Sequence, residues 1–262
     1  MDYFVWNVSP EIFSIGPVTV RWYGALFATG FICGYFIMQW IYRRENKNVA
    51  ELENLLLYVA AGTVIGARLG HCLFYDPAFY LSHPWKILAI WEGGLASHGG
   101  GLGVLIAVYL YCRKYSVSYL WLMDRISITV ALAGSFIRLG NLFNSEILGK
   151  AAEAPWAIIF QRVDSVPRHP VQVYESMSYA IVFVITFLVY KFYSDKLRNG
   201  FIVGLTIVLL VSARIVMEFF KTPQAHYETG LDLSVGQLLS IPYLIAGCVL
   251  IYWALRNGKK AP

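Results

Sequence analysis

Seven apolar runs limit what this chain can fold into. An α-helix needs about 20 residues to cross the hydrocarbon core of a bilayer, and each run approaches or reaches that length. The runs are residues 18–40, 55–74, 95–112, 120–137, 174–190, 201–220 and 238–255. Only 14% of residues are charged, against about 25% in an average soluble domain. We therefore expect an all-α polytopic membrane protein with seven transmembrane helices.

Short connections join the runs, so we expect one integral membrane domain over residues 1–262, with a small external loop region at 138–174. The first residues lack a basic stretch and a small-residue cleavage site, which predicts no removable signal peptide. The four cysteines lack CxxC spacing and lie in or beside apolar runs, so we expect neither a disulfide nor a metal site. They are Cys33, Cys72, Cys112 and Cys248.

Basic residues predict the orientation. Connections on one side of the seven runs hold eleven Lys and Arg residues, and those on the other side hold six. By the positive-inside rule, the N-terminus is outside and the C-terminus is cytoplasmic. The net charge of +5 suits basic loops at a membrane and does not require a nucleic acid partner. Glycines at every fourth position, Gly30 with Gly34 and Gly62 with Gly66 and Gly70, predict close helix crossings.

Most polar residues of the predicted spans fall at their outer ends. They are Tyr23, Arg68, His71, His98, Arg138, Arg214 and Glu218. Single side chains can reach the interface by snorkelling, but the inner ends show only Asp124 and Arg125. Because intramembrane charge is costly, this asymmetry favours one common site that opens outward.

The densest group is RLGNLFNSEILG, residues 138–149. On a helix, Arg138 and Asn141 would share a face, and a guanidinium can bind a phosphate through two hydrogen bonds. An interfacial arginine followed by a polar loop is the alternative. Glu218 lies one turn from Arg214 and could hold its guanidinium in place, or the two could merely neutralise each other.

The segment WEGGLASHGGGLG contains a possible base and a possible anion site. His98 can accept a proton near neutral pH, although a packed, hydrogen-bonding histidine is the alternative. Gly99 and Gly100 would leave backbone N–H groups open at a helix start, where anions bind; close helix packing alone is the alternative. Together these residue types indicate work on an anion at the level of the lipid headgroups.

From end to end, the chain resembles the bacterial prolipoprotein diacylglyceryl transferase family. The matching segments are IFSIGPVTVRWYG, ENLLLYVAAGTVIGARLGHCLFY, WEGGLASHGGGLGV, RLGNLFNSEILG, RHPVQVYE, RIVMEFFKTP and VGQLLSIP. The resemblance implies that the diacylglyceryl group of phosphatidylglycerol passes to the lipobox cysteine thiol of prolipoprotein signal peptides. A thioether forms and glycerol phosphate is released, in the bacterial inner membrane with the active site toward the outer leaflet.

The family's functional positions match residues of this chain. The resemblance and the chemistry together give catalytic roles to Tyr23, His98, Arg138 and Arg214. Expected substrate contacts are Arg68, Gly99, Gly100, Arg138, Asn141, Glu146, Arg214 and Glu218. Ile137 and Ser145 stand where the family usually has glycine, Val171 where it has Ser or Thr, and Lys221 where it has arginine. The Lys221 change keeps the charge but loses the planar fork. The loop after the signature is also shorter than in many relatives.

The expected partners are phosphatidylglycerol, the prolipoprotein and membrane lipid, with no metal and no organic cofactor. Arginines would stabilise charge developing on the phosphate while the thiolate attacks the glycerol carbon. His98 is the candidate base, although an arginine-lined site could lower the thiol pKa without it. The alternative is a transporter or binding protein for an anionic lipid, which should show internal repeats. A polyprenyl-phosphate transferase would need an acidic metal-binding motif, and the sequence has none.

Overall fold

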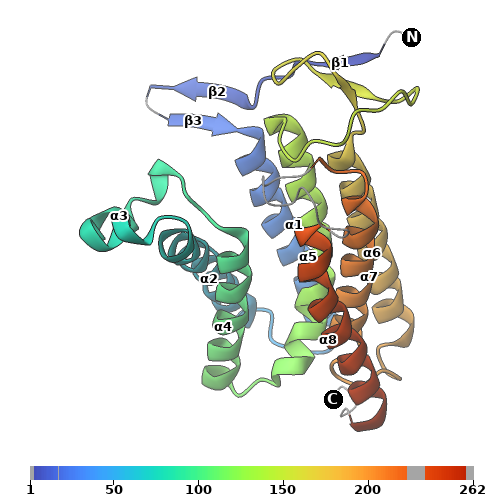
Figure 1. The fold of residues 1–262 in the computed structure, drawn as a ribbon. Helices are drawn as coiled ribbons and strands as arrows, with labels where there is room; N and C mark the ends of the chain where they lie inside the picture. Colours follow the sequence, from blue (N-terminus) through green and yellow to red (C-terminus); the bar gives the residue numbers. More distant parts are fainter. Residues whose placement is uncertain (1–2, 17, 223–233, 258–262) are drawn as a thin grey trace. The chain divides into compact units, whose positions relative to one another are not determined.

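The computed structural model describes residues 3–16, 18–222 and 234–257. Helices occupy all seven predicted span positions (Figure 1). They are α1 (Trp22–Arg44), α2 (Glu51–Phe74), α4 (Ser97–Tyr115), α5 (Tyr119–Asn144), α6 (Val171–Tyr193), α7 (Phe201–Glu218) and α8 (Val235–Asn257). Within the described ranges six of them, all but α4, are long and apolar enough to cross a membrane. A mostly helical membrane protein is therefore confirmed, whereas a span at α4 stays a prediction.

Short strands lie outside the helices, so the all-α expectation was incomplete. The strands are β1 (Phe4–Trp6), β2 (Glu11–Ile15), β3 (Val18–Arg21), β4 (Ile158–Phe160) and β5 (Pro167–Arg168). Strand β4 pairs in parallel with β1 and antiparallel with β5, and β2 with β3 forms a hairpin. Strands of two to five residues are too short for a reliable alternating pattern, which is why the sequence did not reveal them.

The chain divides into two compact units. The larger unit is Met1–Ile37 with Asp124–Pro262, and the smaller unit is Met38–Met123. One continuous domain over residues 1–262 therefore stays a prediction. Between α2 and α4 the smaller unit also contains α3 (Pro77–Ser82) and two 3-10 helices, Pro84–Leu88 and Ile90–Glu92.

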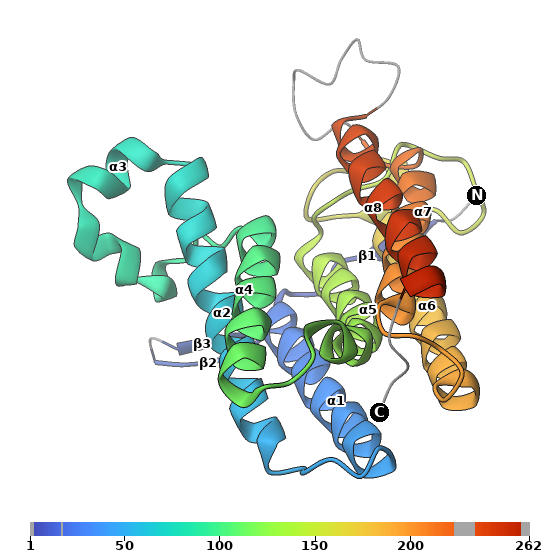
Figure 2. The ribbon, with the colours of Figure 1, turned by 90° about the horizontal axis from the view of Figure 1, so that it is seen from below.

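Glycines bring α2 and α4 into close contact in the smaller unit. The two helices lie side by side in both ribbon views (Figures 1 and 2). A Cβ atom on Gly66 would come 2.8 Å from the Gly103 Cα, and one on Gly70 would come 2.7 Å from the Gly99 Cα. Real side chains do not approach backbone so closely, so only glycine allows this crossing. The predicted close crossing at Gly62, Gly66 and Gly70 is confirmed.

Helices α6, α7 and α8 pack side by side in the larger unit (Figure 2). Small residues again set the spacing, since a Cβ on Gly204 of α7 would come 3.1 Å from the Gly247 carbonyl oxygen of α8. The first part of α1 packs on α5, where a Cβ on Gly30 would come 3.2 Å from Ala133. The close crossing predicted at Gly30 and Gly34 is therefore also present.

A buried carboxylate fastens the start of α7 to α5. Asp124 is 2% exposed, and its two oxygens accept the backbone N–H groups of Gly200 and Val203, each at 2.8 Å. The first N–H groups of a helix have no partner within the helix, so this side chain caps α7 from its neighbour. Asp124 was predicted only as a polar residue near an inner boundary.

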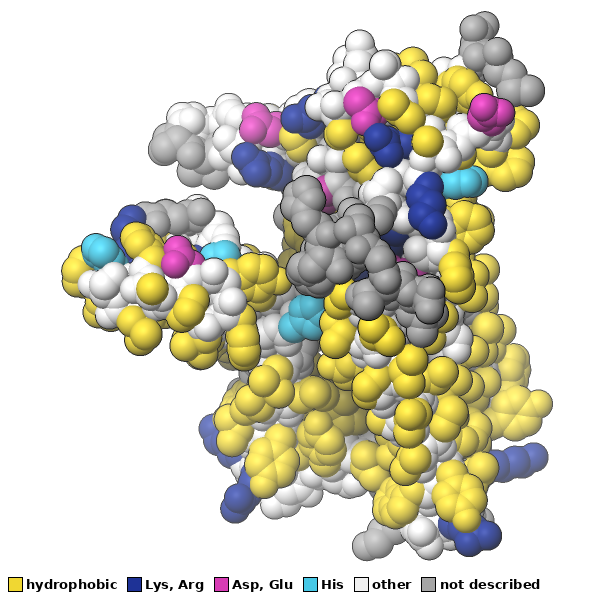
Figure 3. Space-filling model, in the orientation of Figure 1, with side chains coloured by type: hydrophobic (Ala, Val, Ile, Leu, Met, Phe, Trp, Pro, Cys, Tyr) yellow, Lys and Arg dark blue, Asp and Glu magenta, His cyan; other side chains and the backbone are white. Residues whose placement is uncertain are grey.

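The helix surfaces suit a lipid environment. Hydrophobic side chains cover the helical part of the surface, and Lys and Arg side chains gather toward the helix ends (Figure 3). Val216, Ile245 and Val249 are 51%, 58% and 59% exposed. Apolar side chains this exposed along whole helices need an apolar medium around them.

The α2–α4 crossing gives a testable prediction. We expect Gly103→Ala to lower the free energy of unfolding by about 1–3 kcal/mol, because the new Cβ would overlap the Gly62 carbonyl oxygen. Gly101→Ala is the matched control on the same helix, where an added Cβ meets nothing within 4 Å. Denaturant titration in micelles should show a loss for the first variant only; equal midpoints would contradict close packing.

Candidate active site

The first seven signature residues, 138–144, form the last two turns of α5, and residues 145–149 follow the helix. The predicted span ended at Ile137, but α5 continues to Asn144. It continues because this stretch keeps a packed apolar face: Leu142 is 7% exposed, and Phe143 stacks on Trp22 with ring centroids 4.8 Å apart. The predicted external loop therefore begins after Asn144.

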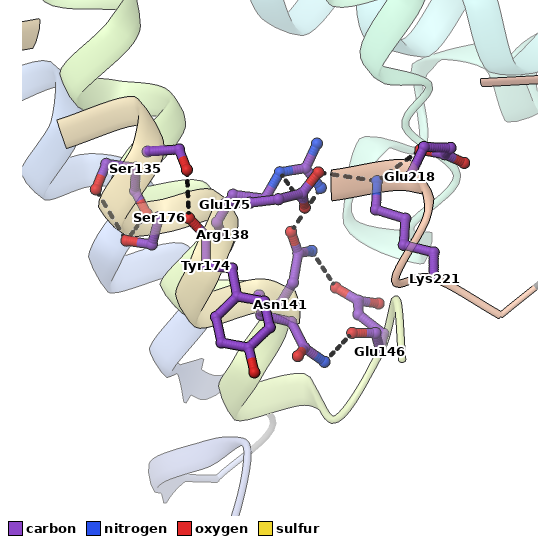
Figure 4. Close-up of polar contacts among 11 residues, drawn as sticks. Ser135, Arg138, Asn141, Glu146, Tyr174, Glu175, Ser176, Glu218 and Lys221 are labelled. Carbon is purple, nitrogen blue, oxygen red and sulfur yellow. Dashed lines mark hydrogen bonds and ion pairs between the residues drawn. The ribbon is translucent and has the colours of Figure 1, made fainter. Parts of the chain in front are cut away.

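Four charged side chains meet at this end of the larger unit. We call Arg138, Glu175, Glu218 and Lys221 the charge cluster (Figure 4). Arg138 Nε lies 3.1 Å from Glu175 Oε2, and Lys221 Nζ lies 2.8 Å from Glu175 Oε1. Lys221 Nζ also lies 3.0 Å from Glu218 Oε2. The cluster thus joins α5, α6 and the turn that follows α7.

The charge cluster is buried and formally neutral. The side chains of Glu175 and Lys221 are 0% and 5% exposed, and those of Glu218 and Arg138 are 10% and 17% exposed. Both contacts of Glu175 are close enough for ion pairs, but their angles do not fit hydrogen bonds. A charge in such a place is tolerated only with its partner, so each member depends on the others.

Glu218 pairs with Lys221 and not with Arg214. The i,i+4 prediction failed because α7 ends at Glu218 and the chain turns, which brings Lys221 back onto that carboxylate. Gly236 of α8 makes room for it, since a Cβ there would come 2.6 Å from Glu218 Oε1. Arg214 is half-buried, and its Nε has no hydrogen-bond partner among the described residues. One of the two expected arginines is thus neutralised, and the other has a buried, unpaired Nε.

Hydrogen bonds run from Arg138 to the turn after α5. Arg138 Nη1 donates to Asn141 Oδ1 at 3.2 Å, and Asn141 Nδ2 donates to Glu146 Oε1 at 2.6 Å. Asn144 Nδ2 donates to the same oxygen at 3.2 Å. The Asn141 amide must point this way, because only its oxygen can accept from a guanidinium.

Two tyrosine rings flank Arg138. Tyr23, on the first turn of α1, packs on Gly140 of α5, where a Cβ would come 2.8 Å from the ring. Its phenol lies within electrostatic range of Arg138 and Glu146. The Tyr179 ring centroid lies 5.8 Å from the guanidinium carbon of Arg138. The structure therefore brings Tyr23, Arg138, Asn141 and Glu146 together.

The loop after the signature closes against α6 and the end of α7. A Cβ on Gly149 would overlap the His169 carbonyl, so this position must be glycine. Lys150 N–H donates to the Phe220 carbonyl at 2.7 Å, beside the bridge between Gly149 and Lys221. Further out, the hydrogen bond from Arg168 lowers the pKa of Asp164. That pair therefore stabilises the loop at neutral pH and is lost only as the pH falls through the lowered pKa.

Comparison with known proteins was decisive. A family model described as prolipoprotein diacylglyceryl transferase matches residues 10–253. The phosphatidylglycerol–prolipoprotein diacylglyceryl transferase of Tolumonas auensis is 52% identical, covering 97% of this chain and 99% of the relative. Those of Chloroherpeton thalassium and Bacteroides fragilis are 48% and 43% identical, covering 98% and 97% of this chain and 97% and 95% of their own.

This chain belongs to the prolipoprotein diacylglyceryl transferase family. The resemblance carried by the sequence motifs is confirmed. Lys221 stands at a position where the family resemblance predicts an arginine. A single ammonium group reaches both Glu175 and Glu218 in this transferase, so the contacts of Lys221 do not need the planar fork.

The remaining expected site residues of this transferase lie in the smaller unit. Arg68 is 3% exposed and donates to the carbonyls of Lys86, Ile87, Gly93 and Gly94, so it holds the connection between α2 and α4. His98 is exposed on the first turn of α4.

Gly99 packs on α2, and the N–H of Gly100 donates to the Ala96 carbonyl at 3.0 Å. These contacts give Gly99 and Gly100 a role in helix packing and in the first turn of α4. Substrate contacts by Arg68, His98, Gly99 and Gly100 stay predictions.

The sequence did not assign a site role to Glu175, and it left that of Lys221 open. The signal for Glu175 is present in RHPVQVYE, one of the segments that carry the family resemblance. Within the described ranges, no three His, Cys, Asp or Glu side chains lie close enough together to hold a metal ion.

The charge cluster gives a stability prediction. Glu175→Gln leaves Arg138 and Lys221 without their shared anion, so we expect a loss of about 3–5 kcal/mol in unfolding free energy. Adding Arg138→Met should recover part of that loss, because it removes the cation that lost its partner while Lys221 keeps Glu218. Asp164→Asn, which weakens the partly exposed Asp164–Arg168 pair in the loop, is the control and should cost at most about 1 kcal/mol. A double variant no more stable than the single one would argue against coupling.

The backbone at Ser145 gives a second prediction. Ser145 has φ 54°, in the left-handed region, and its buried hydroxyl has no hydrogen-bond partner in the described chain. Ser145→Gly removes both costs and should stabilise the protein by about 1–2 kcal/mol. Ser145→Ala removes only the hydroxyl and should gain less. Thermal unfolding of the three proteins in one detergent would test this order.

Proposed function

We propose that this chain transfers the diacylglyceryl group of phosphatidylglycerol to the lipobox cysteine of prolipoproteins, the first step of lipoprotein maturation. The observation that carries the proposal is the family match over residues 10–253, together with relatives whose names state these two substrates. The enzyme is a transferase, and no metal or organic cofactor enters the scheme below.

The reaction exchanges two bonds at the glycerol C3 carbon. The cysteine sulfur forms a bond to this carbon while the bond from carbon to the phosphate oxygen breaks, and the electron pair leaves with glycerol phosphate. Negative charge grows on the phosphate oxygens, so fixed cations there lower the barrier. Arg214 suits this role because its Nε is unpartnered, and Arg138 can add the N–H groups that Glu175 and Asn141 do not use.

The other predicted residues have supporting roles in this scheme. Asn141, Glu146 and Tyr23 orient the headgroup or the peptide backbone, and Glu218 fixes Lys221 at the edge of the site. Arg68, Gly99 and Gly100 remain candidate lipid contacts. His98 is the base that the residue types first suggest for the thiol.

The site belongs at the outer leaflet of the bacterial inner membrane in this proposal. Basic residues fill the last turns of α1, α4, α6 and α8, the ends that the positive-inside rule assigns to the cytoplasm. With α4 added to the six other spans, α5 crosses the membrane in the direction opposite to these four helices. The end of α5, where the signature lies, is then outside. The N-terminus is then external.

Mass spectrometry of a lipobox peptide incubated with phosphatidylglycerol and the purified protein tests the activity. We expect a diacylglyceryl group on the cysteine. Unchanged peptide combined with lipid movement between leaflets would instead support a transporter.

Conservative arginine variants test the phosphate contacts. Arg214→Lys keeps the charge but loses the fork, so we expect about 10²-fold slower transfer at an unchanged unfolding midpoint. Arg138→Lys should lose both transfer and stability, because it also weakens the charge cluster. Arg162→Lys, at an exposed position of the external loop, is the control. Wild-type rates for both Arg138 and Arg214 variants would remove the phosphate role.

A further inference from the structure

Glu146 is an exposed carboxylate that is nevertheless held in one position. Exposed glutamates are usually mobile, because ordering a long side chain costs conformational entropy. Here Oε1 accepts hydrogen bonds from Asn141 at 2.6 Å and from Asn144 at 3.2 Å. In the described part of the chain no donor contacts Oε2, so one oxygen is fixed and the other is open to a ligand.

The backbone of Glu146 is fixed as well. Its N–H donates to the Asn141 carbonyl at 3.1 Å, and its carbonyl accepts from Gln172 Nε2 at 2.7 Å. The residues on either side, Ser145 and Ile147, have φ 54° and 57°. Left-handed backbone is unfavourable for both, most of all for a β-branched isoleucine, and such strain is typical of functional sites. The strained backbone on both sides of Glu146 therefore lowers the stability of the fold while it holds this carboxylate in place.

Its placement couples Glu146 to the anion site. Arg138 donates to Asn141 Oδ1 and Asn141 donates to Glu146, so one amide joins the guanidinium to the carboxylate. A thiol brought beside Arg138 to attack a bound phosphodiester would therefore lie near the open oxygen of Glu146. No other carboxylate of the site is exposed, since Glu175 is fully buried and Glu218 is paired.

We infer that Glu146 is the group that takes the proton from the substrate cysteine. The inference rests on the proposed transfer and adds a proton acceptor to it. As sulfur bonds to the glycerol carbon, the thiol proton moves to Glu146 Oε2, and the electron pair of the broken C–O bond leaves with phosphate. The departing glycerol phosphate or water then takes that proton, which restores the carboxylate.

A carboxylate is a sufficient base for the thiol because arginines lie near the site. A carboxylate is a weaker base than an imidazole, so it needs a thiol whose ionisation is already favoured. Cations near a cysteine favour its thiolate, and Arg138 and Arg214 supply them. Glu146 and Arg138 share one hydrogen-bonded structure through Asn141.

Glu146→Gln tests the inference, because glutamine can still accept the hydrogen bonds of Asn141 and Asn144 but cannot take a proton. We expect single-turnover transfer to the lipobox peptide at pH 7 to fall about 10²–10⁴-fold. The residual rate should rise about tenfold per pH unit up to the thiol pKa of about 8.5, since only ionised thiol then reacts. The wild-type profile should be flatter.

Two further measurements separate a base from a structural residue. Formate should restore several-fold activity to Glu146→Ala by supplying a carboxylate in the vacated space, and it should not restore Arg214→Lys. Glu153→Gln, at an exposed glutamate without a hydrogen bond or ion pair in the described chain, is the matched control and should keep the wild-type profile.

A rate for Glu146→Gln within twofold of wild type, or a loss by the same factor at every pH, would overturn the inference. Failure of the wild-type protein to modify the peptide would instead overturn the proposed function.

Discussion

A glutamate with no exposed surface holds the ends of three helical segments together. Glu175 lies between Arg138 and Lys221, and Lys221 brings Glu218 with it. In a low dielectric none of these charges is tolerated alone, so fixing one fixes all four. The end of α5, the start of α6 and the turn after α7 therefore have one common arrangement, on which the signature turn is built.

The charges near the signature turn comprise the charge cluster and two groups outside it. The charge cluster is neutral by itself, which leaves Arg214 and Glu146 as one cation and one anion outside it. Such a pair suits the two substrates of the proposed reaction, because an anionic phosphodiester needs a cation and a thiol needs a proton acceptor. The charge cluster together with Arg214 and Glu146 carries no formal net charge, which limits the solvation cost before substrates arrive.

The sequence predicted the helices well because each apolar run is a long and redundant signal, whereas strands of two to five residues carry too little pattern. It also grouped Arg138 with Glu146, which are close in the chain. The ion pairs of Glu175 were out of reach, because they join residues far apart in sequence, and spacing rules apply only within one helix. The partner of Glu218 was missed for a related reason: the rule assumed a helix that in fact ends there.

Asp124 fixes the start of α7 on its neighbour. Its contacts with the N–H groups of Gly200 and Val203 anchor the first turn of α7 on α5. Arg214 is eleven residues further along, about 16 Å at 1.5 Å per residue. Glu218, one turn beyond Arg214, is held by the charge cluster, so α7 is anchored at both ends. In the proposed reaction the Arg214 guanidinium is therefore preorganised, because its helix needs no rearrangement when the phosphate arrives.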